Sequence, residues 1–208
     1  MKDIYILGSG GFAKEVYFLI KEIGHFKVKA FVDIEKKGNI SFSETSIPVI
    51  SEEELEEKEI DKISLALGLG DPKLIKKLSD KFKSYHFPNL IHPNVIYDKS
   101  NINIGKGNIV TAGVIMTTHI NIGNYNIFNL STTVGHDVEI GNCNIFNPSV
   151  NISGEVKIGD NNLFGVGSVV LQQKTIGNNN ILGASSLLTK NMNDDLVFIG
   201  VPAKQLNK

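Results

Sequence analysis

The sequence contains no tryptophan and only one cysteine, Cys143, among its 208 residues. A single cysteine excludes an intrachain disulfide, and therefore a disulfide-stabilised secreted domain. Long apolar runs are also missing, which excludes a transmembrane helix. The net charge of -1 gives no reason to expect nucleic acid or an anionic membrane as a partner. No cleavable signal precedes the first expected strand, so we expect a cytoplasmic protein.

Residues 1–87 alternate between strand and helix patterns. This alternation is typical of a parallel α/β sheet, here about half of a Rossmann-like fold. The expected strands lie at 3–7, 28–32 and 63–67, the expected helices at 12–23, after Ser51 and after Asp71, and a possible edge strand at 85–87. The stretch 34–50 is expected to be a loop with one short extended piece at 47–50.

From about residue 88 the pattern changes to a repeat of six residues. Starting at Ile104, every sixth position up to Leu188 is apolar, fifteen positions in all. A longer period of eighteen repeats the pair Ile-Gly five times, and an Asn follows three residues after each of these glycines. Six residues per side and eighteen per coil predict a triangular solenoid whose coils stack at roughly the spacing of β-strands, about 4.8 Å.

Stacking places equivalent side chains in ladders along the solenoid. The apolar ladder is expected to fill the core, and the Asn ladder, which begins at Asn108, to bond amide to amide. Gly and Asn also tolerate the left-handed backbone conformation that tight corners require. The prediction for residues 88–208 is therefore an all-β solenoid, distinct from the α/β domain before it.

The segment GSGGFAK lies between the first expected strand and the first expected helix. Gly10 and Gly11 would let backbone N–H groups approach phosphate oxygens at the helix N-terminus. Asp33 ends the second strand, where a carboxylate can bind a ribose hydroxyl, and Gly68 ends the third strand at the same crevice. Ala13 stands where dinucleotide-binding folds have a third glycine, so a nucleotide or nucleotide-linked sugar fits better than NAD. The alternative is a tight turn without a ligand.

Two of the five histidines, His119 and His136, lie inside the repeat but outside its core register. His136 is followed by Asp137, and the period of eighteen stacks His119 against Asp137 in the neighbouring coil. Metal binding is disfavoured because a γ-type carbonic anhydrase uses three His ligands in such a solenoid and only two are present. A neutral imidazole beside a carboxylate suits general base catalysis of acyl transfer from a thioester. A solvated turn histidine is the alternative, and Cys143 is expected to pack inside a coil rather than act as a nucleophile.

The chain as a whole resembles the sialic acid O-acetyltransferase and nucleotide-aminosugar N-acetyltransferase family of hexapeptide-repeat acyltransferases. Four pieces match in order: GSGGFAK, the hexapeptide solenoid, the segment from Asn129 to Asp137 with its VGHD, and IGVPAK at 199–204. The resemblance implies a Rossmann-like nucleotide-sugar-binding domain at 1–87 and a left-handed parallel β-helix at 88–208. It further implies a homotrimer with acetyl-CoA bound along the groove between neighbouring chains.

Site residues follow from the same resemblance, position by position. His136 matches the catalytic base, Asp137 its acidic neighbour, and Asn129 a polar residue near the acceptor sugar. The nucleotide would be held by Gly10, Gly11, Asp33 and Gly68, and acetyl-CoA would be lined by Gly154, Gly165, Gly183, Pro202 and Ala203. Many members carry a second His near the proline-containing corner, where this chain has IFNP at 145–148. That role would be vacant or taken by His119.

These features lead us to expect a bacterial N-acetyltransferase of surface-glycan biosynthesis that uses acetyl-CoA, no metal and no acyl-enzyme. A backbone N–H of the facing chain would stabilise the oxyanion. O-acetylation of a sialic-acid-type sugar is an alternative within the enzyme class, and a non-catalytic trimeric scaffold is one outside it. A nucleotidyltransferase fits less well, because residues 1–87 are too short and lack its basic nucleotide loop.

Overall fold

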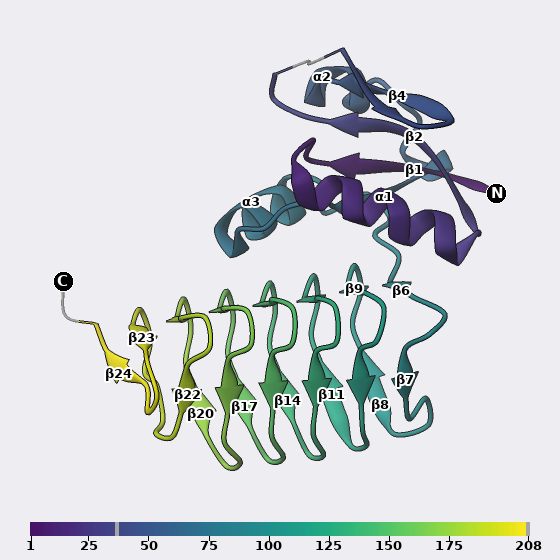
Figure 1. The fold of residues 1–208 in the computed structure, drawn as a ribbon. Coiled ribbons are helices and arrows are strands. Elements are labelled where there is room, and N and C mark those ends of the chain that lie inside the picture. Colours follow the sequence, from purple (N-terminus) through teal and green to yellow (C-terminus); the bar gives the residue numbers. More distant parts are fainter. Residues whose placement is uncertain (36–37, 207–208) are drawn as a thin grey trace.

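A computed structural model describes residues 1–35 and 38–206, which form an N-terminal α/β domain above an elongated solenoid (Figure 1). The solenoid axis runs across the view of Figure 1, and the last strand lies at the end remote from the first coil. Within the described ranges no helix is long and apolar enough to cross a membrane.

The N-terminal sheet has five strands in the order β3-β4-β2-β1-β5. Four of them run parallel, whereas β3 pairs antiparallel with β4. The bounds are β1 (Lys2–Leu7), β2 (Phe26–Val32), β3 (Asn39–Phe42), β4 (Thr45–Ile50) and β5 (Ile63–Leu67). The expected loop is wrong where β3 and the first part of β4 form an antiparallel hairpin, whereas the short extended piece expected at 47–50 is confirmed as part of β4. The possible edge strand at 85–87 is also wrong, since only an isolated bridge joins His86 to Ser64.

The domain has three α-helices: α1 (Gly11–Ile23) and α2 (Glu52–Glu56) lie between strands of this sheet, and α3 (Pro72–Lys81) follows β5. A short 3-10 turn, Ile60–Lys62, precedes β5. The expected capping box forms in α2, where the side chains of Ser51 and Glu54 bond each other's backbone N–H. Asp71 caps α3 with Pro72 at its first turn, also as expected.

Each of the five coils from β6 to β20 contributes one short strand to each of three sheets, whose strands run parallel except for β24, which pairs antiparallel with β23. We call these sheets the first, second and third face. The first face holds β6 (Leu90–Ile91), β9 (Ile109–Val110), β12 (Ile127–Phe128), β15 (Ile145–Phe146), β18 (Leu163–Phe164), β21 (Ile181–Leu182), β23 (Val197–Ile199) and β24 (Lys204–Gln205). The second face holds β7 (Ile96–Tyr97), β10 (Ile115–Met116), β13 (Thr133–Val134), β16 (Asn151–Ile152), β19 (Val169–Val170) and β22 (Leu187–Leu188). The third face holds β8 (Ile102–Ile104), β11 (Ile120–Ile122), β14 (Glu139–Ile140), β17 (Lys157–Ile158) and β20 (Thr175–Ile176).

The predicted ladders are present in the solenoid core. All positions of the six-residue series are buried except Ile104 at its start, which is half-buried. Phe128, Phe146 and Phe164 stack with ring centroids 4.8 Å apart, which matches the spacing of neighbouring strands. The Asn ladder also forms: the amide of Asn144 donates to Asn126 at 3.0 Å and accepts from Asn162 at 2.9 Å.

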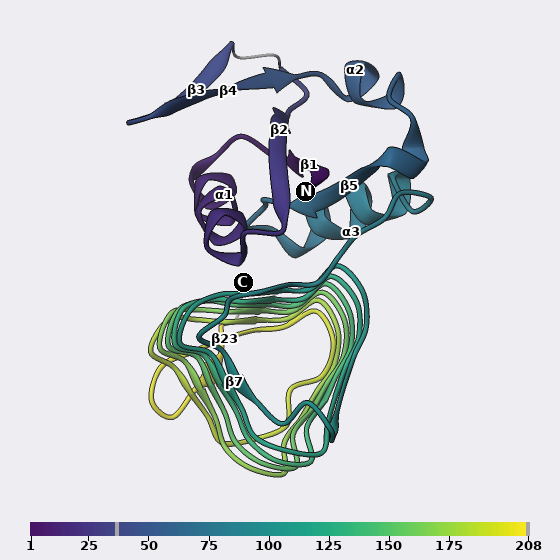
Figure 2. The same ribbon diagram turned by 90° about the vertical axis from the view of Figure 1, so that its right-hand side faces the viewer.

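The N-terminal domain packs on the first face of the solenoid. Ile109, Ile127 and Ile145 point outward from that face and join the same apolar cluster as Ile75 and Phe82 of the α3 region. Seen along the solenoid axis, the coils form a triangle with the domain above one side (Figure 2). The vertex between the other two sides is therefore the point of each coil that lies farthest from the domain.

Candidate active site

His136 and Asp137 form a turn between β13 on the second face and β14 on the third face. Asp137 has a positive φ of 57°, and the same left-handed corner recurs every six residues along the solenoid. The imidazole Nδ1 of His136 lies 2.7 Å from Oδ2 of Asp137, and both side chains are more than half exposed. The structure thus places the two expected catalytic side chains in direct contact.

This contact fixes which nitrogen of His136 is free. An ionised carboxylate only accepts hydrogen bonds, so Nδ1 carries the proton and Nε2 presents a lone pair. The ring lies against Gly154 in the next coil, where an added Cβ would stand 2.6 Å from Nε2. Gly135 has no room for a side chain either, because its Cβ would stand 2.7 Å from the backbone nitrogen of Gly154. Gly154 is therefore needed for the imidazole to reach its position, and Gly135 for the close approach of the two coils.

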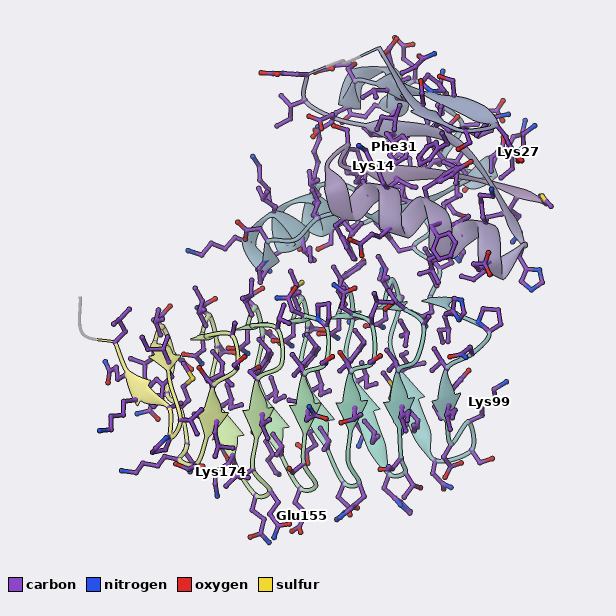
Figure 3. All side chains as sticks on the ribbon, in the orientation of Figure 1. Lys14, Lys27, Phe31, Lys99, Glu155 and Lys174 are labelled. Carbon is purple, nitrogen blue, oxygen red and sulfur yellow. The ribbon has the colours of Figure 1, made fainter. Side chains whose placement is uncertain are left out.

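The vertex that carries His136, which we call the His136 vertex, is remote from the N-terminal domain of the same chain. It joins the second and third faces, whereas the domain covers the first. Glu155, one coil beyond Asp137 at this vertex, lies on the side of the solenoid opposite the domain in Figure 3. A ligand held by the N-terminal domain therefore lies far from His136 of its own chain.

Asn129 occupies a different vertex, between the first and second faces, which we call the Asn129 vertex. Its side chain is 7% exposed, and its amide oxygen has no hydrogen-bond partner within residues 1–35 and 38–206. An unpaired buried amide oxygen is costly unless a ligand or water bonds to it. Asn147 follows one coil later, with its amide bonded to the carbonyl of Phe164 at 2.9 Å. The structure does not bring Asn129 and His136 together within one chain.

Four of the five residues expected to line acetyl-CoA gather near the far end of the Asn129 vertex. Gly165 and Gly183 stack in successive coils, and the backbone N–H of Ala203 donates to the carbonyl of Leu187 at 2.8 Å. Pro202 precedes Ala203 after a cis peptide bond. Gly165 also has a packing role, since its Cβ would lie 2.4 Å from the nitrogen of Ala184. The fifth residue, Gly154, lies instead at the His136 vertex.

The expected nucleotide crevice lies at the carboxyl ends of β1, β2 and β5. Gly10 caps α1 without a side-chain bond, no acidic residue occupies the first turn, and an added Cβ at Gly10 or Gly11 would meet no atom within 4 Å. The helix therefore presents free N–H groups and positive partial charge to open space, as an anion site requires. Gly68 is needed for packing, because its Cβ would lie 2.8 Å from Ala13. Asp33 accepts a hydrogen bond from the Ser9 hydroxyl, a contact that the sequence analysis missed.

His119 lies in the coil before His136, at the same vertex and at the same left-handed position as Asp137. Their backbones are neighbours, since the N–H of Asp137 bonds to the carbonyl of Thr118 at 3.2 Å. The expected stacking of His119 against Asp137 is therefore present in the backbone, but the two side chains bond to other residues. Asp137 bonds to His136, whereas Nδ1 of His119 lies 3.2 Å from the Thr118 hydroxyl. That hydroxyl donates to Asp98 at 2.7 Å, a further link that the sequence analysis missed.

Cys143 packs at the third vertex, beneath α3, as expected for a structural residue. Burial raises the pKa of its thiol to about 11. Its thiolate is therefore scarce at neutral pH, which argues against a nucleophilic role. In residues 1–35 and 38–206 no group of three or more His, Cys, Asp or Glu side chains could hold a metal ion.

A family model described as the PglD N-terminal domain matches residues 3–82. Comparison with curated proteins gives no match. The structure is similar over 99% of its length, and 100% of the other, to the acetyltransferase domain of PglB from Neisseria gonorrhoeae FA1090, with 24% identity and a TM-score of 0.91. It is similar over 100% of its length, and 98% of the other, to PerB from Caulobacter crescentus in complex with CoA and GDP-perosamine, with 29% identity and a TM-score of 0.89. WeeI from Acinetobacter baumannii AYE matches 99% of this chain over its whole length, with 25% identity and a TM-score of 0.86.

These similarities extend over both parts of the chain and preserve their order. They confirm the predicted fold: a Rossmann-like half-domain followed by a left-handed parallel β-helix.

Proposed function

We propose that the chain is a hexapeptide-repeat acetyltransferase with a PglD-type N-terminal domain, and that it transfers an acetyl group from acetyl-CoA to the amino group of a nucleotide-linked 4-amino sugar. We assign this reaction to bacterial surface-glycan biosynthesis. The observation that carries the proposal is the contact of His136 with Asp137, which leaves Nε2 free at an exposed vertex.

Transfer requires removal of a proton from the acceptor nitrogen while that nitrogen attacks the thioester carbonyl. Nε2 of His136 takes this proton as general base. Asp137 stabilises the imidazolium that forms and holds the ring in the productive tautomer. Collapse of the tetrahedral intermediate expels the CoA thiolate, which takes the proton back from His136. A backbone N–H of the facing chain stabilises the oxyanion.

The acceptor reaches His136 from a neighbouring chain, because the N-terminal domain of the same chain covers the opposite side of the solenoid. We therefore propose a homotrimer with its active sites between chains. The second face is suited to this packing. Ile115 projects from it, and Leu130, Val166 and Leu171 lie along its edges, all four with exposed apolar side chains. The third face instead exposes polar side chains, including the ion pair of Lys157 with Glu139 at 3.1 Å.

Packing along the second face brings the Asn129 vertex of one chain toward the His136 vertex of the next. The unpaired amide oxygen of Asn129 would then bond the acceptor sugar. Acetyl-CoA would lie along the groove between the two vertices, against Gly165, Gly183 and the Pro202–Ala203 segment of one chain and Gly154 of the other. This arrangement gathers every site residue of the solenoid in one place.

The nucleotide would bind at the free N-terminus of α1, where Gly10 and Gly11 leave room for the diphosphate. Asp33, held by Ser9, is placed to accept from a ribose hydroxyl. PerB, which shares the fold and 29% of the sequence, was solved with CoA and GDP-perosamine. A nucleotide-linked amino sugar of this kind is the acceptor class that best fits the crevice.

The test is consumption of acetyl-CoA with a panel of UDP-, dTDP- and GDP-linked 4-amino sugars and with sialic acids. We expect turnover with at least one amino sugar, and His136→Ala should lower kcat by about 10²-fold or more without loss of trimer, the usual scale for a general base. Near-normal turnover by this variant would rule out the role of His136. Turnover with sialic acids alone would favour O-acetylation, and absence of both turnover and CoA binding would favour a scaffold.

A further inference from the structure

His119 is a second imidazole at the His136 vertex that the mechanism above does not use. Its Nδ1 lies 3.2 Å from the Thr118 hydroxyl, whose oxygen lies 2.7 Å from Oδ2 of Asp98. Asn101 and the backbone N–H of Ser100 also donate to Asp98. The vertex therefore carries two imidazoles in neighbouring coils, each linked to a carboxylate.

The direction of these hydrogen bonds follows from the number of protons available. The donors around Asp98 hold the pKa of its carboxyl below the usual range, so it is ionised and only accepts. Thr118 has a single hydroxyl proton, which it donates to Asp98. Its oxygen must then accept from His119, so Nδ1 of His119 carries a proton and Nε2 is free. This relay, which runs from Asp98 through Thr118 to His119, thus gives His119 the same tautomer that Asp137 gives His136.

The proposed acceptor needs a second base because an alkyl amine is largely protonated at neutral pH. Two protons must leave its nitrogen: one before attack, to free the lone pair, and one during attack. His136 takes the second proton and passes it to the CoA thiolate, so His136 cannot also accept the first proton. His119 lies one coil away, within roughly 5 Å along the solenoid axis.

We propose that His119, positioned by Thr118 and Asp98, is a second catalytic residue that takes the first proton from the ammonium form of the acceptor. This inference rests on the proposed function. The ammonium N–H bond breaks and a proton bonds Nε2 of His119, which leaves the neutral amine to attack the thioester. The imidazolium of His119 then releases its proton to water, because its side chain is exposed. The net products are the acetamide, CoA thiol and one proton.

Three groups besides the relay bear on the charge of His119. Asp137 lies on the coil above it and favours the protonated imidazole, whereas a protonated His136 would disfavour it. Lys99 is next to Asp98 in the sequence, but its ammonium lies over the ring of Tyr97, 5.5 Å from the centroid. The two imidazoles therefore work best in turn, since the first proton leaves His119 before His136 becomes charged.

The test is the pH dependence of kcat/KM for the acceptor in His119→Gln, which keeps a polar side chain but cannot take the proton. We expect a loss of about tenfold or more near pH 6.5 and recovery to nearly wild-type rates above the pKa of the amine, where the first proton is already gone. Thr118→Val should shift the profile in the same direction. His92→Gln is the matched control, because the imidazole of His92 accepts from the nearby Asn94 N–H at 3.1 Å and lies at another vertex, and its profile should equal that of the wild type.

An equal loss at every pH would reduce His119 to a structural or binding role and overturn the inference, as would a wild-type profile. The relay can also be tested directly by the ¹⁵N chemical shifts of the His119 imidazole, measured above the pKa of His119. A proton on Nε2 of His119 in the wild type would contradict the relay. No turnover of any amine would overturn both this inference and the proposed function. Turnover that needs His136 but not His119 at low pH would overturn this inference alone.

Discussion

Individual glycines in this chain have two different physical roles, and a substitution can separate them. Gly154 leaves space for the end of a side chain, the imidazole of His136, whereas Gly165 leaves space for the backbone of the next coil. A ring can rotate away from an added methyl group, but stacked backbone cannot. Under the proposed function, the same residue type would support catalysis at one position and folding at the other.

If His136 acts as proposed, Gly154→Ala is expected to lower kcat by about tenfold or more while the protein stays folded, because its Cβ would displace Nε2. Gly165→Ala is the contrasting variant, in which the methyl group meets backbone at 2.4 Å. We expect it to lower the melting temperature by several degrees, as overpacking does. The two measurements are steady-state kinetics and thermal unfolding. Unchanged kcat in Gly154→Ala would show that the imidazole does not act from this position.

At the scale of elements, each coil of the solenoid depends on its neighbours through buried amides. The side chain of Asn144 is fully buried and serves three coils at once. It donates to Asn126 and to the carbonyl of Gly159, and it accepts from the backbone and side chain of Asn162. A second ladder, exposed or half-buried, runs through Asn124, Asn142, Asp160, Asn178 and Asp194.

Asn144→Ala should therefore lower the free energy of unfolding by about 2–4 kcal/mol, because it leaves several buried polar groups without partners. Asn103→Ala is the matched control, since its amide bonds only to Asn121 on the exposed third face. We expect less than about 0.5 kcal/mol there. Denaturant titrations at one protein concentration make the comparison, because the proposed trimer assembly would add to apparent stability. Equal effects of the two variants would contradict the ladder as a source of stability.

The solenoid was predictable because its sequence pattern repeats. A departure from the pattern in one coil does not hide the period, since the other coils still show it. The fifteen apolar positions and the ladder from Asn108 needed only a count along the chain. The hairpin β3–β4 was missed because Gly38 and the polar residues around it resemble a loop and the pairing is not repeated. Most of the second ladder could have been found one residue after the repeated Ile-Gly, where four of the five pairs are followed by Asn or Asp. The Asp98–Thr118–His119 relay could not, since Asp98 precedes the regular coils and its spacing to Thr118 departs from the period.

At the scale of the whole molecule, the three faces of the solenoid have separate roles. The first face carries the N-terminal domain, the third exposes polar side chains, and the second exposes apolar side chains suited to a neighbouring chain. The acceptor crevice and His136 then lie on opposite sides of each chain. The central claim is that a complete site needs both a His136 vertex and an N-terminal domain from different chains.

Complementation between two inactive variants tests this claim most directly. One is His136→Ala. The other is Gly11→Asp, which has room for the side chain and suits the first turn of α1, but places negative charge at the proposed diphosphate site. Gly11→Asn, of nearly the same shape without the charge, is its control. Each variant alone should have little activity at low acceptor concentration.

The measurement is kcat/KM for the acceptor after the two variants are mixed in equal amounts and reassembled as trimers. Random assembly between chains pairs an intact His136 with an intact acceptor crevice in about a quarter of the sites, so we predict about a quarter of wild-type activity. Sites built within one chain would each keep one defect. A mixture no more active than its two components would therefore contradict the account.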